Sequence, residues 1–289
     1  VRTYESWDAI PYYEKDRNGD ILVWDFMGGD LYGIADKLDY ISELGANAVY
    51  LNPIFEAASN HRYDTANYKK VDPVLGGDAA FEELAAAAKK KKIRLVLDGV
   101  FSHTGCDSIY FDRYGHYGGN GAYGNPDSPY RSWYRFKGHG DDEYECWWGC
   151  KALPNVNEMN PGYLSYIVEG EDSVLDHWLQ KGVSGFRLDV ADELPDEFIQ
   201  ALRRRSDGQP DGAERILIGE VWEDASNKIS YGIRRRYFTD ADLHSVTNYV
   251  FRDRMTEFLT GKISSSALWS SLLSLYENYP RHNFYAALN

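Results

Sequence analysis

The stretch Gly185-Phe186-Arg187-Leu188-Asp189-Val190-Ala191-Asp192-Glu193 begins like a buried strand, yet it carries a cation and a carboxylate two residues apart. Successive side chains of a strand point to opposite faces, so Arg187 and Asp189 share one face and the apolar Phe186 takes the other. Burying a charge is costly unless a partner compensates it. Arg187 would keep the Asp189 carboxylate ionised through its opposite charge. The stretch therefore predicts a strand that ends in a functional acid.

Two other apolar runs also end in an acid, Arg94-Leu95-Val96-Leu97-Asp98 and Ile216-Leu217-Ile218-Gly219-Glu220. In a closed parallel barrel the carboxyl ends of all strands meet at one face, so we expect these two acids and Asp189 to converge. A single acid in such a position is more often a helix cap or a hydrogen-bond acceptor. Three of them together favour an active site.

Strand-like runs alternate with amphipathic stretches from about residue 33 onward, which is typical of βα units and an α/β fold with a parallel sheet. The patterns predict helices at about 33–44, 78–92, 171–182, 196–205 and 264–277, and strands at about 47–52, 93–98, 185–189, 215–219, 244–248 and 284–288. Between Ser102 and Glu169 the alternation fails, and a composition rich in Tyr, Gly, Asp and Trp indicates an irregular insertion. A chain of 289 residues fits one large barrel with an insertion better than two equal domains.

The chain carries 31 Lys and Arg against 45 Asp and Glu, a formal charge of −14, which repels nucleic acid and anionic membranes. No apolar run approaches the roughly 20 residues that span a bilayer, and Val1-Arg2-Thr3-Tyr4 is not a signal peptide. We therefore expect neither a nucleic-acid nor a membrane partner. Free cysteines and the lack of a leader favour the cytoplasm, with secretion left open.

The segment around Cys146-Trp147-Trp148-Gly149-Cys150 permits more than one interpretation. Its cysteine spacing could indicate a metal site, but no second Cys/His pair with suitable spacing follows it. Its tryptophans, together with Trp133, could form a sugar-stacking wall or the insertion's own small core. The sequence leaves the last two possibilities equal.

Two acids in different environments are what glycoside hydrolysis needs, one to protonate the leaving oxygen and one to attack or stabilise the sugar cation. The same acids could instead hold Mg²⁺ in an enolase-like barrel, because carboxylates at strand ends are hard oxygen ligands. Spacing alone leaves both chemistries open.

Several motifs resemble those of one known family, the α-amylase superfamily of glycoside hydrolases (family 13). Its first three conserved regions are similar to Asp98-Gly99-Val100-Phe101-Ser102-His103, Gly185-Phe186-Arg187-Leu188-Asp189 and Gly219-Glu220-Val221-Trp222, and its second-strand signature to Gly45-Ala46-Asn47-Ala48-Val49-Tyr50-Leu51-Asn52-Pro53-Ile54-Phe55. Asp189-Val190-Ala191-Asp192-Glu193 and Leu153-Pro154-Asn155-Val156-Asn157 are similar to the neopullulanase, cyclomaltodextrinase and amylopullulanase branch. The order and separation of the motifs agree over nearly the whole chain.

The resemblance implies a TIM-type (β/α)8 barrel with an irregular domain B inserted after strand 3. Barrel domain A would comprise 1–103 and 170–289, and domain B would comprise 104–169. We expect the barrel to be truncated at both ends, so that the chain is a catalytic-domain fragment. An incomplete barrel exposes strand edges, which favours a homodimer.

The resemblance also implies roles for individual residues. Asp189 would be the nucleophile, Glu220 the general acid/base and Arg187 the partner of Asp189. The subsite of the attacked glucose would be lined by Tyr63, Asp98 and His103. Trp222 and Glu223 follow Glu220 directly and are expected to contact substrate by position.

The implied reaction is hydrolysis of α-1,4, and in some cases α-1,6, bonds in starch-type glucans, maltodextrins, cyclodextrins or pullulan. It would proceed by a retaining double displacement and require no cofactor. The family's fourth region carries a His-Asp pair, whereas this sequence has no His-Asp dipeptide. That departure predicts, as an alternative, a catalytically impaired fragment that binds carbohydrate.

A structural Ca²⁺ is a further expectation. Many relatives carry an Asn at the position of Ser102 that helps bind calcium, so this chain departs from that site. Asp16, Asn18 and Asp20 alternate in Asp16-Arg17-Asn18-Gly19-Asp20 and could hold a different Ca²⁺. A plain Asn-Gly turn is the competing interpretation, because no later Glu completes a calcium loop.

Overall fold

The computed structural model describes residues 2–4, 6, 8–19, 21–22, 24–138, 140–239 and 242–287. The chain divides into two compact units, Val1–Val183 (unit 1) and Ser184–Asn289 (unit 2). This division differs from the domain limits predicted above, which stay a prediction. In the described part of the chain, no helix combines the length and the apolar character needed to cross a membrane.

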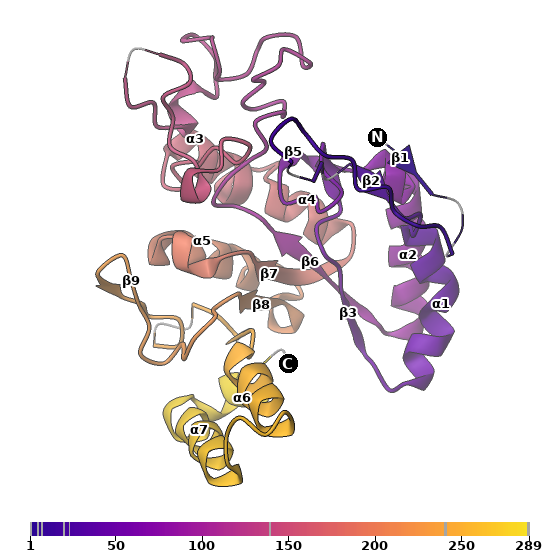
Figure 1. Ribbon diagram of the computed structural model, residues 1–289, viewed down its shortest axis with the longest axis vertical. Coiled ribbons are helices and arrows are strands. Elements are labelled where there is room, and N and C mark those ends of the chain that lie inside the picture. The colour runs from indigo at the N-terminus through magenta and orange to yellow at the C-terminus, as the bar shows by residue number, and fades with distance from the viewer. Residues whose placement is uncertain are drawn as a thin grey trace. The chain divides into compact units, whose positions relative to one another are not determined.

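Unit 1 is built around two parallel strands and two helices that pack on each other. Strand β3 (Ala48–Tyr50) pairs in parallel with β6 (Arg94–Gly99), with Ala48 opposite Arg94. Helices α1 (Leu31–Glu43) and α2 (Gly77–Lys91) lie side by side (Figure 1). Asp30 starts α1 because its side chain accepts a hydrogen bond from the Gly33 amide at 2.8 Å. These elements confirm the predicted order of helix, strand, helix and strand.

A hairpin between β3 and α2 was not predicted from the sequence. Its antiparallel strands are β4 (Phe55–Ala57) and β5 (Thr65–Val71), with irregular register, and their connection carries Tyr63. Helix α4 (Val174–Gln180) anchors the hairpin through Trp178, whose indole donates to the Tyr68 carbonyl at 2.7 Å and stacks on Phe55. The loop that carries Tyr63 thus connects two strands that pack on helix α4.

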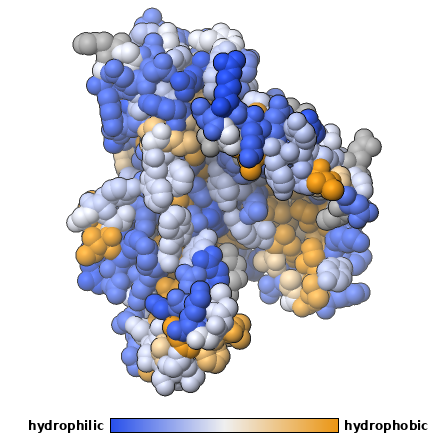
Figure 2. Space-filling model, in the orientation of Figure 1, coloured by the Kyte–Doolittle hydropathy of each residue, from blue (hydrophilic) through white to orange (hydrophobic). Residues whose placement is uncertain are grey.

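The segment that follows β6 is irregular, as expected. Apart from α3 (Pro161–Leu164) and the π-turn Ser165–Glu169, its described residues form short 3₁₀ turns and isolated bridges, with Trp133 buried among tyrosines. The rings around Trp133 belong to Tyr110, Tyr130, Tyr163 and Tyr166, with centroids 4.7 to 5.5 Å away. Trp133 is therefore part of a local core. Figure 2 shows the visible surface over this segment as mainly hydrophilic.

Unit 2 continues the alternation with three parallel strands. Strand β7 (Val183–Leu188) pairs with β8 (Ile216–Gly219), with Arg187 opposite Ile218, and β8 pairs with β11 (Ser245–Val246). Helix α5 (Asp196–Asp207) connects β7 to β8, which makes a βαβ unit. All three strands run in one direction, so their carboxyl ends lie at one edge.

The remaining elements of unit 2 correct the sequence-based expectations in two places. Helices α6 (Tyr249–Leu259) and α7 (Ser265–Asn278) lie side by side (Figure 1), and α6 was not predicted because its described residues include no buried one. The strand predicted at 284–288 is wrong, since α8 (Arg281–Tyr285) covers its first residues. Pro280 precedes this helix, and the buried Asn283 donates to the carbonyls of Leu243 and His244.

Two short pairs of strands complete the described elements. Strand β1 (Arg2–Thr3) runs parallel to β2 (Asp25–Phe26) in unit 1. In unit 2, β9 (Ile229–Ser230) and β10 (Ile233–Arg234) form an antiparallel hairpin with exposed isoleucines, visible as an apolar group over that hairpin in Figure 2.

Candidate active site

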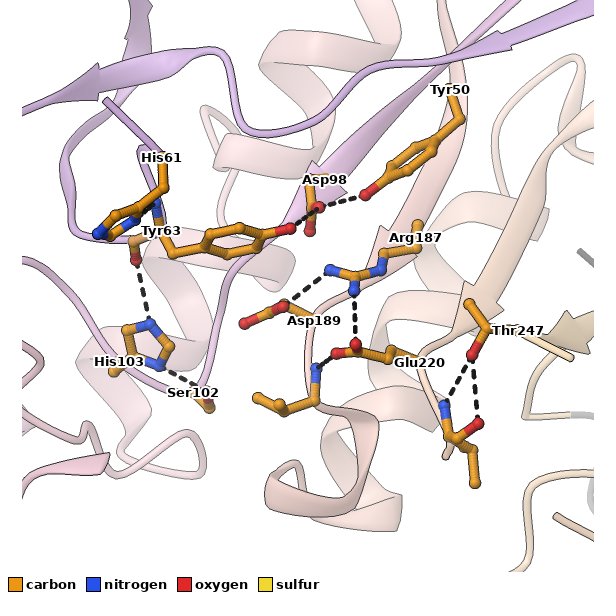
Figure 3. A network of polar contacts seen from close by, with 12 residues as sticks. Tyr50, His61, Tyr63, Asp98, Ser102, His103, Arg187, Asp189, Glu220 and Thr247 are labelled. Atoms are coloured by element: carbon orange, nitrogen blue, oxygen red, sulfur yellow. Dashed lines mark hydrogen bonds and ion pairs between the residues drawn. The ribbon is translucent and has the colours of Figure 1, made fainter. Parts of the chain in front are cut away.

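The acids at the ends of β7 and β8 meet through one guanidinium. Arg187 lies 2.8 Å from Asp189, measured from Nη1 to Oδ1, and 3.0 Å from Glu220, measured from Nη2 to Oε1 (Figure 3). All three side chains are buried. The ion pair expected from the two-residue spacing is present, and the parallel pairing of β7 with β8 adds Glu220 to it. A buried charge cluster of this kind is stable only with close partners, which the fork of Arg187 supplies.

Glu220 is held by three further donors. Its Oε1 accepts from the Trp222 indole at 3.1 Å and the Tyr249 hydroxyl at 3.3 Å, and its Oε2 accepts from the Val190 amide at 2.8 Å. Burial, together with the charge of Glu220, raises the pKa of Tyr249, so this hydroxyl stays protonated and able to donate. The Glu220 carboxylate is thus fixed in position by groups from three parts of unit 2.

The backbone at Val190 is strained. This β-branched residue has φ 38° and ψ 61°, in the left-handed region that such residues avoid. Strain of this kind costs on the order of 1–3 kcal/mol and is found mainly at functional sites. Val190 directly follows Asp189 in the chain, and its strained backbone points its amide at Glu220.

In unit 1, Asp98 of β6 lies among aromatic hydroxyls. It is buried, and its Oδ2 accepts from the Tyr50 hydroxyl and from the Tyr63 hydroxyl, the latter at 3.4 Å (Figure 3). Tyr63 is half-buried and stacks on His61, with ring centroids 6.0 Å apart. The structure thus brings together Asp98 and Tyr63, two of the residues predicted to hold a sugar.

His103 completes this group by holding the loop of Tyr63. Its Nε2 lies 3.0 Å from the Tyr63 carbonyl oxygen, and its Nδ1 lies 3.0 Å from the Ser102 hydroxyl (Figure 3). Because a carbonyl can only accept, Nε2 carries the proton and Nδ1 accepts from Ser102. Complete burial lowers the pKa of His103 from 6.5 to about 4, so the imidazole is neutral near pH 7.

This lowered pKa predicts a pH dependence of stability. Between pH 6.5 and about 4 the unfolded state protonates this histidine and the folded state does not. The unfolded state then binds more protons, so the free energy of unfolding falls as the pH falls, by up to about 3 kcal/mol at the acid end. Urea unfolding of the chain and of His103→Gln at pH 7 and pH 4.5 measures this, and the variant should show the flatter profile.

His282→Gln is the matched control for that measurement, because His282 is exposed. Its profile should follow that of the parent chain. His244, whose pKa burial also lowers to about 4, contributes to the slope that remains in His103→Gln, as do His61 and His177, whose pKa values burial lowers too. An equal slope in the His103→Gln and parent profiles would contradict a neutral, buried His103.

The other two residues predicted to contact substrate behave differently from each other. Trp222 is 45% exposed while its indole nitrogen donates to Glu220, so its ring is accessible beside the acid. Glu223 is exposed and pairs with Lys228, which also lies 3.0 Å from Asp192. The structure therefore brings Trp222, and not Glu223, into hydrogen-bonding contact with Glu220.

The predicted calcium ligands form a turn. Asp16 accepts from the Asn18 amide at 2.8 Å and from the Asn18 side chain at 3.4 Å, and Gly19 follows at φ 91°. Asp20 lies outside the described residues. The described residues of this run therefore form the competing Asn-Gly turn, and the calcium site stays a prediction. Among the residues that the structure describes, no three His, Cys, Asp or Glu side chains gather as metal ligands.

Two residues of these groups were missed in the sequence analysis. Tyr50 lies opposite Val96 in the β3–β6 register, and Val96 shares its face of β6 with Asp98, so the alternation of strand side chains could have indicated it. Tyr249 begins helix α6, which was not predicted, and no local pattern connects it with Glu220.

Known proteins similar to this chain define its family. The family description "Alpha amylase, catalytic domain" matches residues 10–283. The chain belongs to this family of α-amylase catalytic domains. The family, together with the structural match given below, implies a TIM barrel, to which the parallel strands and helices of each unit correspond.

The similar proteins are glycosidases of the α-amylase type. An amylopullulanase of Thermoanaerobacterium saccharolyticum is 39% identical over 100% of this chain and 24% of its own length. Neopullulanase 2 of Thermoactinomyces vulgaris is 32% identical over 96% of this chain and 43% of its own length. The solved cyclic α-maltosyl-(1→6)-maltose hydrolase of Arthrobacter globiformis, in complex with cyclic α-maltosyl-(1→6)-maltose, matches with TM-score 0.79 and 29% identity over 96% of this chain and 58% of that one. The chain thus spans less than two thirds of each of these proteins.

Proposed function

We propose that this chain is the catalytic part of a glycosidase that cleaves α-1,4 bonds in starch-type glucans with retention of configuration. The observation that carries the proposal is the single guanidinium of Arg187, which bridges the buried carboxylates of Asp189 and Glu220. Two acids held by one small group lie close together. Retaining glycosidases use a carboxylate separation of about 5–5.5 Å, whereas inverting ones need room for a water between the acids.

In the proposed reaction Asp189 attacks the anomeric carbon and forms a glycosyl ester, while Glu220 gives its proton to the departing glycosidic oxygen. Water then loses a proton to Glu220 and attacks the same carbon, which releases Asp189 as a carboxylate. Arg187 keeps Asp189 ionised and oriented through its 2.8 Å contact. The acid pair needs no organic cofactor for these steps.

Sugar binding is proposed for Tyr63, Asp98 and His103 in unit 1 and for Trp222 and Glu223 in unit 2. The Asp98 carboxylate suits sugar hydroxyls, and the half-buried Tyr63 ring suits the apolar face of a pyranose. His103 contributes by fixing the Tyr63 backbone. For Glu223 the proposal rests on its sequence position after Glu220.

The range of substrates is proposed from the names of the relatives. Amylopullulanase and neopullulanase are named for pullulan, and the structural relative was solved with a ligand containing a (1→6) linkage. We therefore include maltodextrins, cyclodextrins and pullulan, with α-1,6 bonds as a second linkage. The segment 104–169 is proposed to act as domain B. The homodimer, the structural Ca²⁺ and the cytoplasmic location stay predictions.

A second candidate is a chain that binds α-glucans without cleaving them. The sequence has no His-Asp dipeptide, whereas the family that it resembles carries this pair in its fourth conserved region. This difference favours the second candidate. Both candidates require the sugar-binding residues, but only the first predicts that the bound glucan is cleaved.

The test is chromatographic product analysis after incubation of the chain with maltoheptaose and with pullulan. We expect shorter maltooligosaccharides, no effect of EDTA on the acid chemistry, and no products from Glu220→Gln, which keeps the shape of the carboxylate but cannot supply its proton. Retention of sugar on a maltoheptaose affinity column without products would support the second candidate. The absence of both products and retention would refute both candidates. Loss of products in EDTA that Mg²⁺ restores and Ca²⁺ does not would favour the Mg²⁺ chemistry.

A further inference from the structure

Two tryptophans of unit 1 form a parallel pair at the surface. The rings of Trp147 and Trp148 are 5.0 Å apart with an interplanar angle of 8°, and Trp148 is 69% exposed. This separates them from Trp133, which is buried in the tyrosine cluster. Of the three tryptophans in this segment, Trp133 is core, and the half-buried Trp147 and exposed Trp148 form a stack, here called the indole pair.

The loop that carries the indole pair is fastened by backbone hydrogen bonds to the segment that follows His103. The Trp147 amide donates to the Leu153 carbonyl at 2.9 Å, which closes the loop beneath the pair. The same loop is fastened to residues 104–106 by two more backbone bonds, from Thr104 to Pro154 at 3.1 Å and from Cys106 to Ala152 at 2.8 Å. A surface held in this way loses little conformational entropy when it binds a ligand.

Two features of the indole pair do not help the fold. Trp148 adopts φ 47°, a left-handed conformation that costs energy for any residue except glycine. The Trp147 indole nitrogen is buried and, within the described part of the chain, has no hydrogen-bond partner. A left-handed backbone at an exposed tryptophan, beside an unsatisfied buried donor, favours a role in binding over a role in stability.

The indole pair also adjoins the predicted sugar subsite of unit 1. The Trp147 ring centroid lies 6.1 Å from that of His103, whose Nε2 holds the Tyr63 backbone. The three rings of His103, Trp147 and Trp148 therefore lead from the buried group around Asp98 to solvent. Pyranose rings present apolar C–H faces that pack on flat aromatic surfaces such as the exposed ring of Trp148.

We propose that the indole pair is an additional α-glucan subsite, in which the exposed face of Trp148 stacks on a glucosyl unit. The glucan bound there would be longer than the residues around Tyr63 alone can hold. This inference rests on the proposed function, since it extends the same glucan along unit 1. It makes Trp148 a determinant of chain-length preference.

The test is isothermal titration of maltose and maltoheptaose into the full chain carrying Glu220→Gln, so that no ligand is consumed, with and without Trp148→Ala. Removing the stacked ring is expected to raise the Kd for maltoheptaose about tenfold and to leave the Kd for maltose unchanged. Trp148→Phe should recover part of the affinity. The urea midpoint of Trp148→Ala should match that of the parent chain.

Trp269→Ala is the matched control, because Trp269 of α7 is 66% exposed and belongs to unit 2. Its Kd for maltoheptaose should not change. Equal maltoheptaose affinities for Trp148→Ala and its parent would overturn the subsite while leaving the proposed function intact. A change in sedimentation coefficient without a change in Kd would also overturn it, in favour of a contact between copies. If the parent binds neither sugar, the proposed function fails first and the subsite fails with it.

Discussion

Replacing Arg187 with methionine is expected to lower the free energy of unfolding by about 3–5 kcal/mol. The guanidinium is buried with Asp189 and Glu220 and lies 2.8 Å and 3.0 Å from one oxygen of each. Methionine fills much of the same volume but leaves two buried carboxylates without their counter-charge. Urea unfolding followed by tryptophan fluorescence measures the loss.

The matched control is Arg254→Met, because Arg254 forms an exposed ion pair with Glu257 at 2.8 Å. Exposed pairs of this kind contribute about 0–1 kcal/mol. A triple variant with Arg187→Met, Asp189→Asn and Glu220→Gln should recover most of the stability, because the uncompensated charges are then gone. Equal losses for Arg187→Met and Arg254→Met would show that burial of the cluster has no energetic effect.

Substitution of Gly185 by alanine is expected to destabilise unit 2 by about 4 kcal/mol or more, which is exceptional for the addition of one methyl group. Gly185 has φ 152°, and a Cβ atom built on it would lie 1.8 Å from the Ile216 carbonyl oxygen and 2.7 Å from the carbonyl carbon. These are backbone atoms of β8, the strand that pairs with β7, so relief requires the two strands to separate. The expected outcome is a large drop in the urea midpoint, or insoluble expression.

Gly29→Ala serves as the control for that substitution. A Cβ atom at Gly29 would have no heavy atom within 4 Å, and its φ is not positive. The control should unfold at the same urea concentration as the parent chain. If Gly185→Ala did so as well, the close approach of β7 and β8 would be wrong.

The parts of the site that could be predicted from the sequence are those fixed by strand geometry. The two-residue period of a strand gives the pairing of Arg187 with Asp189, and the parallel direction of β7 and β8 brings Glu220 to the same edge. The contact between Asp98 and Tyr63 came from the resemblance, because no local spacing relates a strand end to a hairpin loop.

The remainder depends on tertiary contacts that local patterns do not encode. Helix α8 stands where a strand was predicted: the side chain of Asn283 bonds to Leu243 and His244, just before β11, and short apolar runs are ambiguous between helix and strand. The left-handed backbone of Val190 contradicts the preference of valine and is maintained by its bond to Glu220. Burial places Trp133 in a local core and leaves Trp148 exposed, so the sugar-stacking wall stays a proposal for Trp147 and Trp148.

The two ion pairs of the Arg187 guanidinium affect which ligands the site would bind with the highest affinity. With Asp189 ionised and Glu220 protonated the buried trio sums to zero, and when Glu220 releases its proton the sum becomes −1. In the proposed reaction that negative charge arises when the glucosyl carbon becomes cationic, so the three side chains and the sugar together remain neutral. A ground-state sugar carries no such positive charge, whereas a sugar analogue with a protonated ring nitrogen carries it at all times. On the proposed mechanism, the site should hold basic sugar mimics more firmly than the glucans proposed as its substrates.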